Sequence, residues 1–161
     1  MIRPVKTSDI AEICDIYNHY VLTSTITFEE TAVSVEDMSD RVADISAKYP
    51  WLVYEHEGKV AGYAYAGPWK SRCAYRHSVE STIYLRHDML GQGMGFKLYG
   101  ALIEELGKTD THGVIGGVAL PNEGSIALHK KLGFEQVAHF KEVGYKFDTW
   151  IDVTYWEMIL T

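Results

Sequence analysis

The segment 81–96, with the sequence STIYLRHDMLGQGMGF, constrains the fold of this chain more than any other. Residues 82–85 are β-branched, aromatic or apolar, which is typical of a buried strand. Gly91, Gly93 and Gly95 follow at the point where the next helix should begin. The start of a helix presents unpaired backbone N–H groups and a partial positive charge, which suit a phosphate group. The segment therefore predicts a strand, a glycine loop and a helix that bind a phosphorylated ligand.

Length, composition and charge bound the class of protein. The 161 residues are expected to form one domain, 1–161. The composition, with 47% hydrophobic and 23% charged residues, is ordinary for a soluble globular protein. The formal charge of −7 argues against a nucleic-acid-binding protein, which needs a basic surface. The N-terminal residues have no apolar signal-like stretch, and no run reaches the length of a membrane span. We therefore expect a cytoplasmic protein that binds neither nucleic acid nor membrane.

The sequence does not predict a metal site. Cys14 and Cys73 are far apart, and neither belongs to a metal-binding spacing. The seven histidines show no ligand-like spacing with cysteines or carboxylates. We therefore expect no metal.

Hydrophobic periodicity predicts the order of the helices and strands. A short strand at 2–5 precedes a helix with an apolar stripe over 10–21, for which Asp9 and Glu12 have the spacing of a capping box. Ser34 is the expected N-cap of a second helix, and Asn122 is a candidate N-cap for the helix at 122–132. The remaining elements are strands at 51–56, 59–66, 79–85 and 114–120, helices at 94–106 and 122–132, and two strands within 134–160. This order predicts an α/β fold with a mixed sheet flanked by helices.

Two common phosphate-binding loops do not fit the spacing of the glycines. A Walker loop requires Gly-Lys-Ser/Thr, whereas Gly95 is followed by Phe96, Lys97 and Leu98. A dinucleotide-binding fingerprint requires a further glycine three residues after the second of its pair, where Phe96 or Leu98 stands. That fingerprint also follows the first strand of its domain, and this loop lies deep in the chain. A different phosphate-binding family must account for the loop.

The loop and the segments around it resemble the GNAT family of acyl-CoA-dependent N-acyltransferases. The block LPNEGSIALHKKLGF at 120–134 closely matches the second motif of that family. Segments 49–85 and 142–156 are similar to its phosphinothricin N-acetyltransferase branch, which includes enzymes acting on methionine sulfoximine and methionine sulfone. The resemblance covers nearly the whole chain. It implies a GNAT fold with a mixed, mostly antiparallel central sheet flanked by helices, and acetyl-CoA as co-substrate.

The resemblance implies that acetyl-CoA lies along the strand and the glycine loop. Backbone groups of Ile83 and Leu85 would pair with the pantetheine arm, and amides of residues 92–96 would bind the pyrophosphate. Leu90 stands where Gln or Arg is usual, so we expect binding by backbone more than by side chain. The complete set of cofactor-binding candidates is Ile83, Tyr84, Leu85, Gln92, Gly93, Met94, Gly95, Phe96, Asn122, Ser125 and Lys131.

Glu80 and His129 are the candidates for proton transfer. The amine of an amino acid is mostly protonated at neutral pH, so a base makes it more nucleophilic toward a thioester. The resemblance implies that Glu80 is this base, directly or through a water, if its side chain faces the cleft. An exposed glutamate at the end of a strand is the simpler alternative. His129 stands where many GNAT enzymes have tyrosine. It could protonate the leaving thiolate as imidazolium, relay a proton as imidazole, or simply be a packed helix residue.

The substrate candidates combine cations with aromatic and hydroxyl groups. Lys70 and Arg72 place two cations beside Trp69 and Tyr75 on one loop, which suits an amino acid with a carboxylate and a phosphinyl or sulfonyl group. Charges that contact only water are the simpler alternative for this loop. The resemblance adds positions elsewhere, so that the full set of substrate-binding candidates is Phe28, Tyr65, Lys70, Arg72, Tyr75, Thr82 and Tyr99.

The expected function is N-acetylation of a small amino-acid-like substrate such as phosphinothricin, methionine sulfoximine or methionine sulfone, in a homodimer like those usual for the family. Two alternatives remain open at this point. The substrate could be another amine, a polyamine or a protein N-terminus, and the acidic charge keeps the polyamine possible. The chain could instead be a regulatory domain that binds acyl-CoA without turnover, although such a domain needs no acid–base residues.

Overall fold

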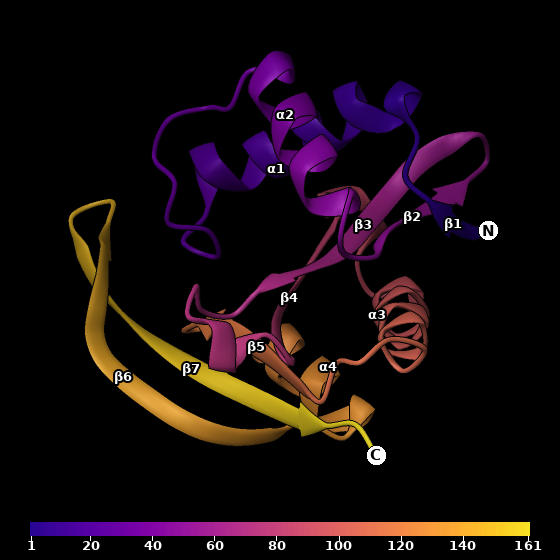
Figure 1. The fold of residues 1–161 in the computed structure, drawn as a ribbon. Coiled ribbons are helices and arrows are strands. Elements are labelled where there is room, and N and C mark those ends of the chain that lie inside the picture. The colour runs from indigo at the N-terminus through magenta and orange to yellow at the C-terminus, as the bar shows by residue number, and fades with distance from the viewer.

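The computed structural model describes residues 1–161 and contains one seven-stranded sheet with the strand order β1-β2-β3-β4-β5-β7-β6 (Figure 1). The strands are β1 (Ile2–Pro4), β2 (Trp51–His56), β3 (Lys59–Pro68), β4 (Ser78–Leu85), β5 (Gly113–Ala119), β6 (Glu135–Lys146) and β7 (Thr149–Ile159). The helices are α1 (Ile10–Thr23), α2 (Val35–Ser46), α3 (Met94–Leu106) and α4 (Glu123–Leu132). The predicted order of elements and the mostly antiparallel sheet are confirmed.

The β4–β5 pair differs from every other pair in the sheet. All other neighbouring strands are antiparallel, whereas β4 and β5 are parallel and pair only from Ser78 to Glu80. Beyond Glu80, β4 continues alongside β3 as far as Leu85, and β5 continues alongside β7 as far as Ala119. The two strands therefore separate in the middle of the sheet.

The helices cover the two faces of the sheet. Alternate residues of β2 point to opposite faces, so Trp51 and Val53 pack with α1 and α2, while Leu52 packs with α3. Each face therefore has its own hydrophobic core, and the two cores fix the strands between them. None of the helices combines the length and the apolar character that crossing a bilayer requires.

Two predicted helix caps are confirmed and one is wrong. The Ser34 side chain accepts a hydrogen bond from the Asp37 amide at 3.0 Å, and Asn122 accepts one from the Ser125 amide at 3.1 Å. Asp9 does not cap α1. Its carboxylate accepts hydrogen bonds from Arg3 at 2.8 Å and from a backbone amide earlier in the chain. The partly buried ion pair with Arg3 therefore replaces the expected capping box.

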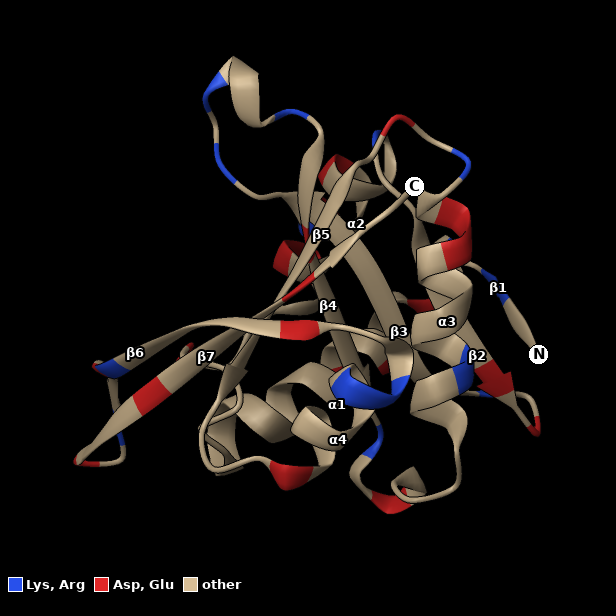
Figure 2. Ribbon diagram, turned by 90° about the horizontal axis from the view of Figure 1, so that it is seen from below, with Lys and Arg blue, Asp and Glu red and all other residues tan.

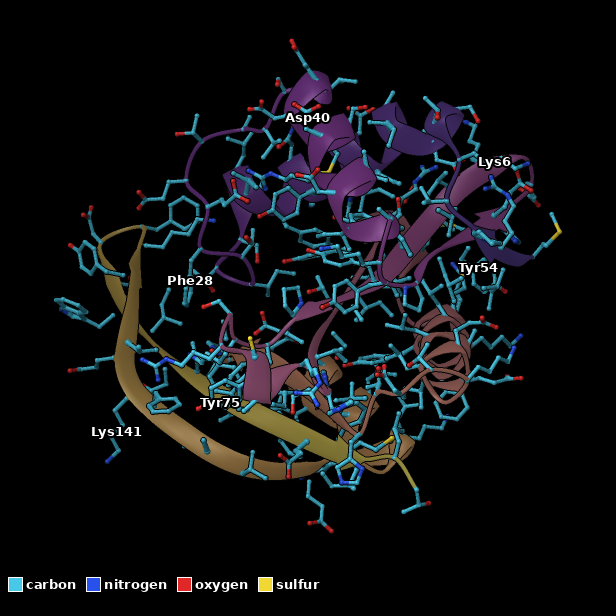
Figure 3. All side chains as sticks on the ribbon, viewed as in Figure 1. Lys6, Phe28, Asp40, Tyr54, Tyr75 and Lys141 are labelled. Carbon is cyan, nitrogen blue, oxygen red and sulfur yellow. The ribbon has the colours of Figure 1, made fainter.

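The long hairpin of β6 and β7 curves toward the loop that follows α1 (Figure 1). Lys146, near the end of β6, is buried and donates hydrogen bonds to the carbonyl oxygens of Ser24 at 2.7 Å and Thr27 at 2.8 Å. The Phe28 ring lies against Gly144, where an added Cβ would come within 2.4 Å of it. Figure 3 shows Phe28 in the space between this loop and the hairpin. The lysine therefore joins two segments more than 100 residues apart.

Candidate active site

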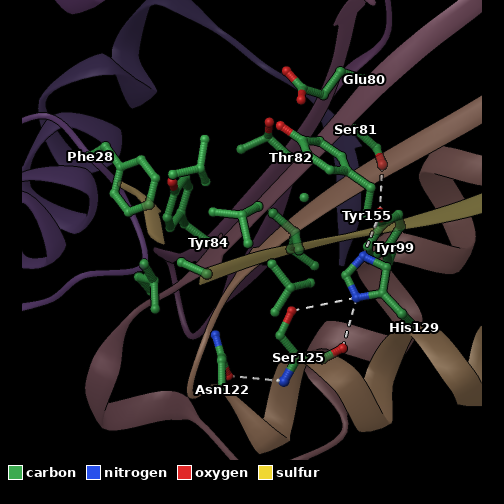
Figure 4. Close-up of a pocket in the computed structure, with 17 residues that line it drawn as sticks. Phe28, Glu80, Ser81, Thr82, Tyr84, Tyr99, Asn122, Ser125, His129 and Tyr155 are labelled. Atoms are coloured by element: carbon green, nitrogen blue, oxygen red, sulfur yellow. Dashed lines mark hydrogen bonds between the residues drawn. The ribbon is translucent and has the colours of Figure 1, made fainter. Parts of the chain in front are cut away.

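A cleft opens where β4 and β5 separate, and we call it the β4–β5 cleft (Figure 4). Its volume is about 500 Å³. Its walls come from the strands β4, β5, β6 and β7, the helices α3 and α4, and the loop after α1. The lining residues are Ile26, Phe28, Glu80, Ser81, Thr82, Ile83, Tyr84, Tyr99, Gly117, Val118, Ala119, Asn122, Ser125, His129, Val143, Val153 and Tyr155.

The exposed backbone of β4 faces this cleft at alternate residues. The Arg86 amide donates to the Ala61 carbonyl at 2.8 Å, and this bond sets which residues of β4 bond to β3. Because hydrogen-bonded pairs alternate in an antiparallel ladder, Tyr84 uses its backbone groups toward β3, whereas Ile83 and Leu85 direct theirs toward the cleft. The Leu85 carbonyl also accepts a hydrogen bond from the Tyr20 hydroxyl at 2.5 Å. Ile83 and the Leu85 amide therefore remain available to a ligand.

Glu80 is partly buried at one end of the β4–β5 cleft, and no protein group donates a hydrogen bond to its carboxylate. Burial raises its pKa above the usual range, and the positive charge of Lys70 opposes that rise. The negative charge of Glu80 in turn contributes to raising the pKa of Tyr155, which also lines the cleft, although burial is the larger cause. The carboxylate is thus a free proton acceptor with a raised pKa.

The glycine loop forms a second cleft, the glycine-loop cleft, of about 620 Å³ at the N-terminus of α3. Gly91 and Gly93 have φ values of +76° and +77°, in the left-handed region that glycine tolerates best. Gly93 is the N-cap of α3, so the loop directs the first amides of the helix outward. The two clefts share five lining residues from β4, the start of α4 and the loop after α1: Ile26, Ile83, Tyr84, Asn122 and Ser125. Together they form one groove from Glu80 to the glycine loop.

Most of the predicted cofactor residues line the glycine-loop cleft. They are Ile83, Tyr84, Leu85, Gly93, Gly95, Phe96, Asn122, Ser125 and Lys131. Gln92 is exposed and the Met94 side chain is buried, and neither side chain lines the cleft, so these residues can offer only backbone groups. Leu90 lines the cleft as an exposed apolar side chain and offers no hydrogen-bonding group.

His129 lies inside the protein at the inner end of the β4–β5 cleft. Burial lowers its pKa, and its Nδ1 is 2.7 Å from the Ser125 carbonyl oxygen. The Tyr99 hydroxyl is 3.1 Å from its Nε2 and also contacts the Ser81 hydroxyl (Figure 4). Tyr99 was expected to contact substrate, but its hydroxyl is already engaged within the protein.

The predicted substrate residues do not share one cavity. Phe28, Thr82 and Tyr99 line the β4–β5 cleft. Tyr65 instead lines a separate cleft of about 260 Å³, where it stacks on Trp51 with ring centroids 4.0 Å apart.

Lys70, Arg72 and Tyr75 line a fourth cleft, because the loop between β3 and β4 turns away from the sheet around a short 3₁₀ turn at Cys73–Tyr75. Figure 2 shows this loop projecting from the body of the protein, with Lys and Arg on it and no Asp or Glu. The charge of Lys70 still acts on Glu80.

Two residues of the cleft, Ser81 and Tyr155, were not predicted from the sequence. Ser81 sits beside Glu80 in β4 and reaches Tyr99, and Tyr155 crosses the cleft from β7 opposite Gly117. A Cβ at Gly117 would lie 3.2 Å from the Tyr155 ring. Glycines inside a strand mark a close approach of another group, so Gly117 in β5 was a signal for the Tyr155 contact, whereas no signal marked Ser81.

The comparisons with known proteins agree with this geometry. The sequence of residues 2–155 matches the family model of the acetyltransferase (GNAT) domain. A phosphinothricin N-acetyltransferase of Streptomyces viridochromogenes is 41% identical over 97% of this chain and 85% of its own length. An L-methionine sulfoximine/L-methionine sulfone acetyltransferase of Salmonella typhimurium is 37% identical over 99% of this chain and 94% of its own.

The fold gives the same result. The crystal structure of a GNAT superfamily phosphinothricin acetyltransferase from Sinorhizobium meliloti, in complex with acetyl-CoA, superposes with a TM-score of 0.96 at 34% identity. The alignment covers 99% of this chain and 88% of that one. The chain therefore belongs to the GNAT family of acetyltransferases.

Proposed function

We propose that this enzyme transfers the acetyl group of acetyl-CoA to the amine of a small amino-acid-like substrate. The observation that carries the proposal is the position of Glu80, a partly buried carboxylate without a hydrogen-bond partner, in the same groove as the glycine loop. A groove of this kind can hold a phosphorylated acyl donor and an amine at its two ends. The substrates named for the similar enzymes support the same class of amine.

The residues of the groove fit acetyl-CoA as the donor. The amides at the start of α3 and the left-handed glycines suit a pyrophosphate. The backbone groups of Ile83 and the amide of Leu85 suit the pantetheine arm, which itself carries amides. Lys131 lines the same cleft and adds a positive charge near Phe96. The acetyl group would then lie beside the half of β4 that is nearer to Glu80.

The reaction we propose is direct attack of the amine on the thioester. Glu80, in its ionised form, takes a proton from the substrate ammonium directly or through one water. The neutral nitrogen then forms a C–N bond with the acetyl carbon, and the C–S bond breaks when the tetrahedral intermediate collapses. The amine gives up its second proton, and the CoA thiolate takes one in the cleft. His129 is buried with a lowered pKa, which favours a neutral imidazole that relays a proton over an imidazolium that donates one.

The composition of the β4–β5 cleft favours an amino-acid-like substrate over a polyamine. Glu80 is the only carboxylate among its lining residues, so a second or third ammonium group would have no partner there. Hydroxyl and aromatic groups from Thr82, Tyr155 and Phe28 offer contacts to a polar, partly apolar side chain. Lys70 adds a positive charge near Glu80, which suits a substrate that carries acidic groups.

An amine panel tests this specificity. With acetyl-CoA present, we expect rapid CoA release with phosphinothricin or methionine sulfone, and release near the no-amine background with spermidine or an N-terminal peptide. CoA release is followed with a thiol reagent, and the acetylated product is identified by mass spectrometry. If spermidine were the only amine that is acetylated, the substrate would be a polyamine and not an amino acid. Tight acetyl-CoA binding without turnover on any amine would support a regulatory domain instead.

We also propose that the enzyme is a homodimer. Large apolar side chains on the β6–β7 hairpin are exposed, namely Val137, Phe140, Val143, Tyr145, Phe147 and Trp150. An exposed apolar surface of this extent is typical of a protein interface, and Val143 also lines the β4–β5 cleft. Sedimentation velocity should therefore give twice the chain mass of 18.2 kDa, and a single species of one chain mass at micromolar concentration would contradict it.

A further inference from the structure

A continuous set of buried hydrogen bonds lies at the point where β4 and β5 separate. It links the Ser81 hydroxyl in β4, the Tyr99 hydroxyl in α3 and the His129 ring in α4. Tyr99 and His129 are 1% and 3% exposed, and Ser81 is also buried. The set ends at the carbonyl oxygen of Ser125, one turn before His129 in the same helix. None of these contacts involves the glycine loop.

The order of the hydrogen bonds follows from the last acceptor. Nδ1 of His129 has two neighbours on Ser125, the carbonyl oxygen at 2.7 Å and the hydroxyl at 3.4 Å. A carbonyl oxygen can only accept, so the much shorter contact places a hydrogen on Nδ1. In a neutral imidazole the other nitrogen, Nε2, is then an acceptor, and the Tyr99 hydroxyl 3.1 Å away donates to it. The Tyr99 oxygen can accept in turn from Ser81, which has the Ile115 carbonyl at 3.4 Å as an alternative acceptor.

The packing around His129 leaves its ring little freedom to turn. The rings of Tyr99 and Phe134 meet it nearly edge-on, with centroids 5.2 Å and 5.0 Å away. On the strand side, a Cβ at Gly116 would lie 2.6 Å from Nε2 and 3.0 Å from the Tyr99 hydroxyl. Glycine at this position of β5 therefore makes room for both polar groups.

The groups that face His129 include no carboxylate. Tyr99 reaches it from α3, and Trp156 of β7 adds an aromatic ring 6.2 Å away. Glu80 in β4 acts on the neighbouring Tyr99 and makes no hydrogen bond with the imidazole. An imidazolium here would have no counter-ion in contact and little water, which is costly inside a protein.

We infer that Tyr99, itself oriented by Ser81, is a positioning residue that holds His129 as the neutral tautomer with hydrogen on Nδ1 and an acceptor at Nε2. His129 in the resting enzyme then has no proton to donate from Nε2, and any proton it receives there passes through the Tyr99 hydroxyl. The kinetic part of this inference depends on the proposed acetyltransferase reaction. The tautomer does not, because it belongs to the protein without substrates.

The test is NMR of the protein labelled with ¹⁵N-histidine, with the His129 signals identified by their loss in His129→Asn. We expect the wild type to show a protonated Nδ1 and an unprotonated Nε2 from pH 6 to 8. In Tyr99→Phe the neutral form loses the hydrogen bond to Nε2, so the His129 pKa should rise and the signals should begin to titrate. A wild type with hydrogen on Nε2, or an imidazolium at pH 7, would overturn the inference.

A second variant and a rate measurement separate positioning from mere packing. Ser81→Ala keeps the Tyr99 ring and should give a smaller shift in the same direction, which also serves if Tyr99→Phe does not fold. With an active amine, Tyr99→Phe should lower kcat by about tenfold, the effect expected of one lost hydrogen bond, with the KM for acetyl-CoA unchanged. If kcat falls while the His129 signals of both variants match the wild type, Tyr99 acts through packing and the inference fails. If the signals shift in a protein that turns over no amine, the proposed function fails instead.

Discussion

Replacing Glu80 with glutamine is expected to lower kcat by about 10²–10⁴-fold, the usual contribution of a general base. Glutamine has nearly the same size, so the walls of the β4–β5 cleft should stay in place. It cannot accept the proton of the substrate ammonium. Acetyl-CoA should still bind with nearly wild-type affinity, because its proposed contacts lie at the C-terminal end of β4 and along the glycine loop. Steady-state rates and isothermal titration calorimetry measure the two quantities separately.

The proposed role of Glu80 also predicts how the rate changes with pH. Burial raises the pKa of Glu80, and the base works only when ionised. The wild-type kcat/KM should therefore fall as the pH drops through this raised pKa, and that acid limb should be absent from Glu80→Gln. Lys70 opposes the rise, so Lys70→Met should move the limb to higher pH.

Glu135→Gln is the matched control, because Glu135 is exposed at the start of β6 and lines neither cleft. It should leave both the rate and the pH profile unchanged. If Glu80→Gln retains the wild-type rate at every pH, Glu80 is not the base, and the proton must leave by another route.

The glycine loop leads to the second large effect. Gly93→Ala should weaken acetyl-CoA binding by about tenfold or more. An L-residue in the left-handed region costs roughly 1–2 kcal/mol, and relief of that strain would shift the amides at the start of α3. No neighbouring atom lies within 4 Å of an added Cβ, so the effect would come from the backbone and not from a clash.

Gly58→Ala provides an unusually close control. Gly58 also has φ of +77° and open space around it, but it lies in the β2–β3 turn, away from both clefts. Both variants should lose similar stability in urea unfolding, and only Gly93→Ala should lose affinity for acetyl-CoA in calorimetry. Equal affinities in the two variants would show that the loop backbone does not bind the pyrophosphate.

Local signals in the sequence were sufficient for most of the fold. The succession of a strand-like segment, a glycine loop and a helical segment predicted β4 and α3. The caps at Ser34 and Asn122 were identified correctly because a cap depends on residues three positions apart. The groove was predictable for the same reason, since β4, the loop and α3 are consecutive in the chain. Motif spacing therefore located the proposed binding site for the phosphorylated ligand.

The contacts between distant segments were not predictable from one sequence. Asp9 fits a helix cap locally, but Arg3 reaches it across the start of the chain and forms an ion pair instead. The Tyr99–His129 contact joins two helices 30 residues apart, and nothing in either helix alone indicates it. Lys70 was expected to face the substrate cleft, yet a loop without periodicity carries no information about the direction in which it turns. These features depend on tertiary packing, which local patterns do not encode.

The most direct test of the proposed acetyl transfer is the stoichiometry of the reaction of acetyl-CoA with phosphinothricin or methionine sulfone, catalysed by the wild-type enzyme. We expect one equivalent of CoA and one equivalent of a product acetylated on the amine nitrogen, with the position of the acetyl group determined by NMR of the purified product. Glu80→Gln should form the same product at a much lower rate. CoA release without an N-acetylated product, or tight acetyl-CoA binding with no reaction on any amino-acid-like amine, would contradict it.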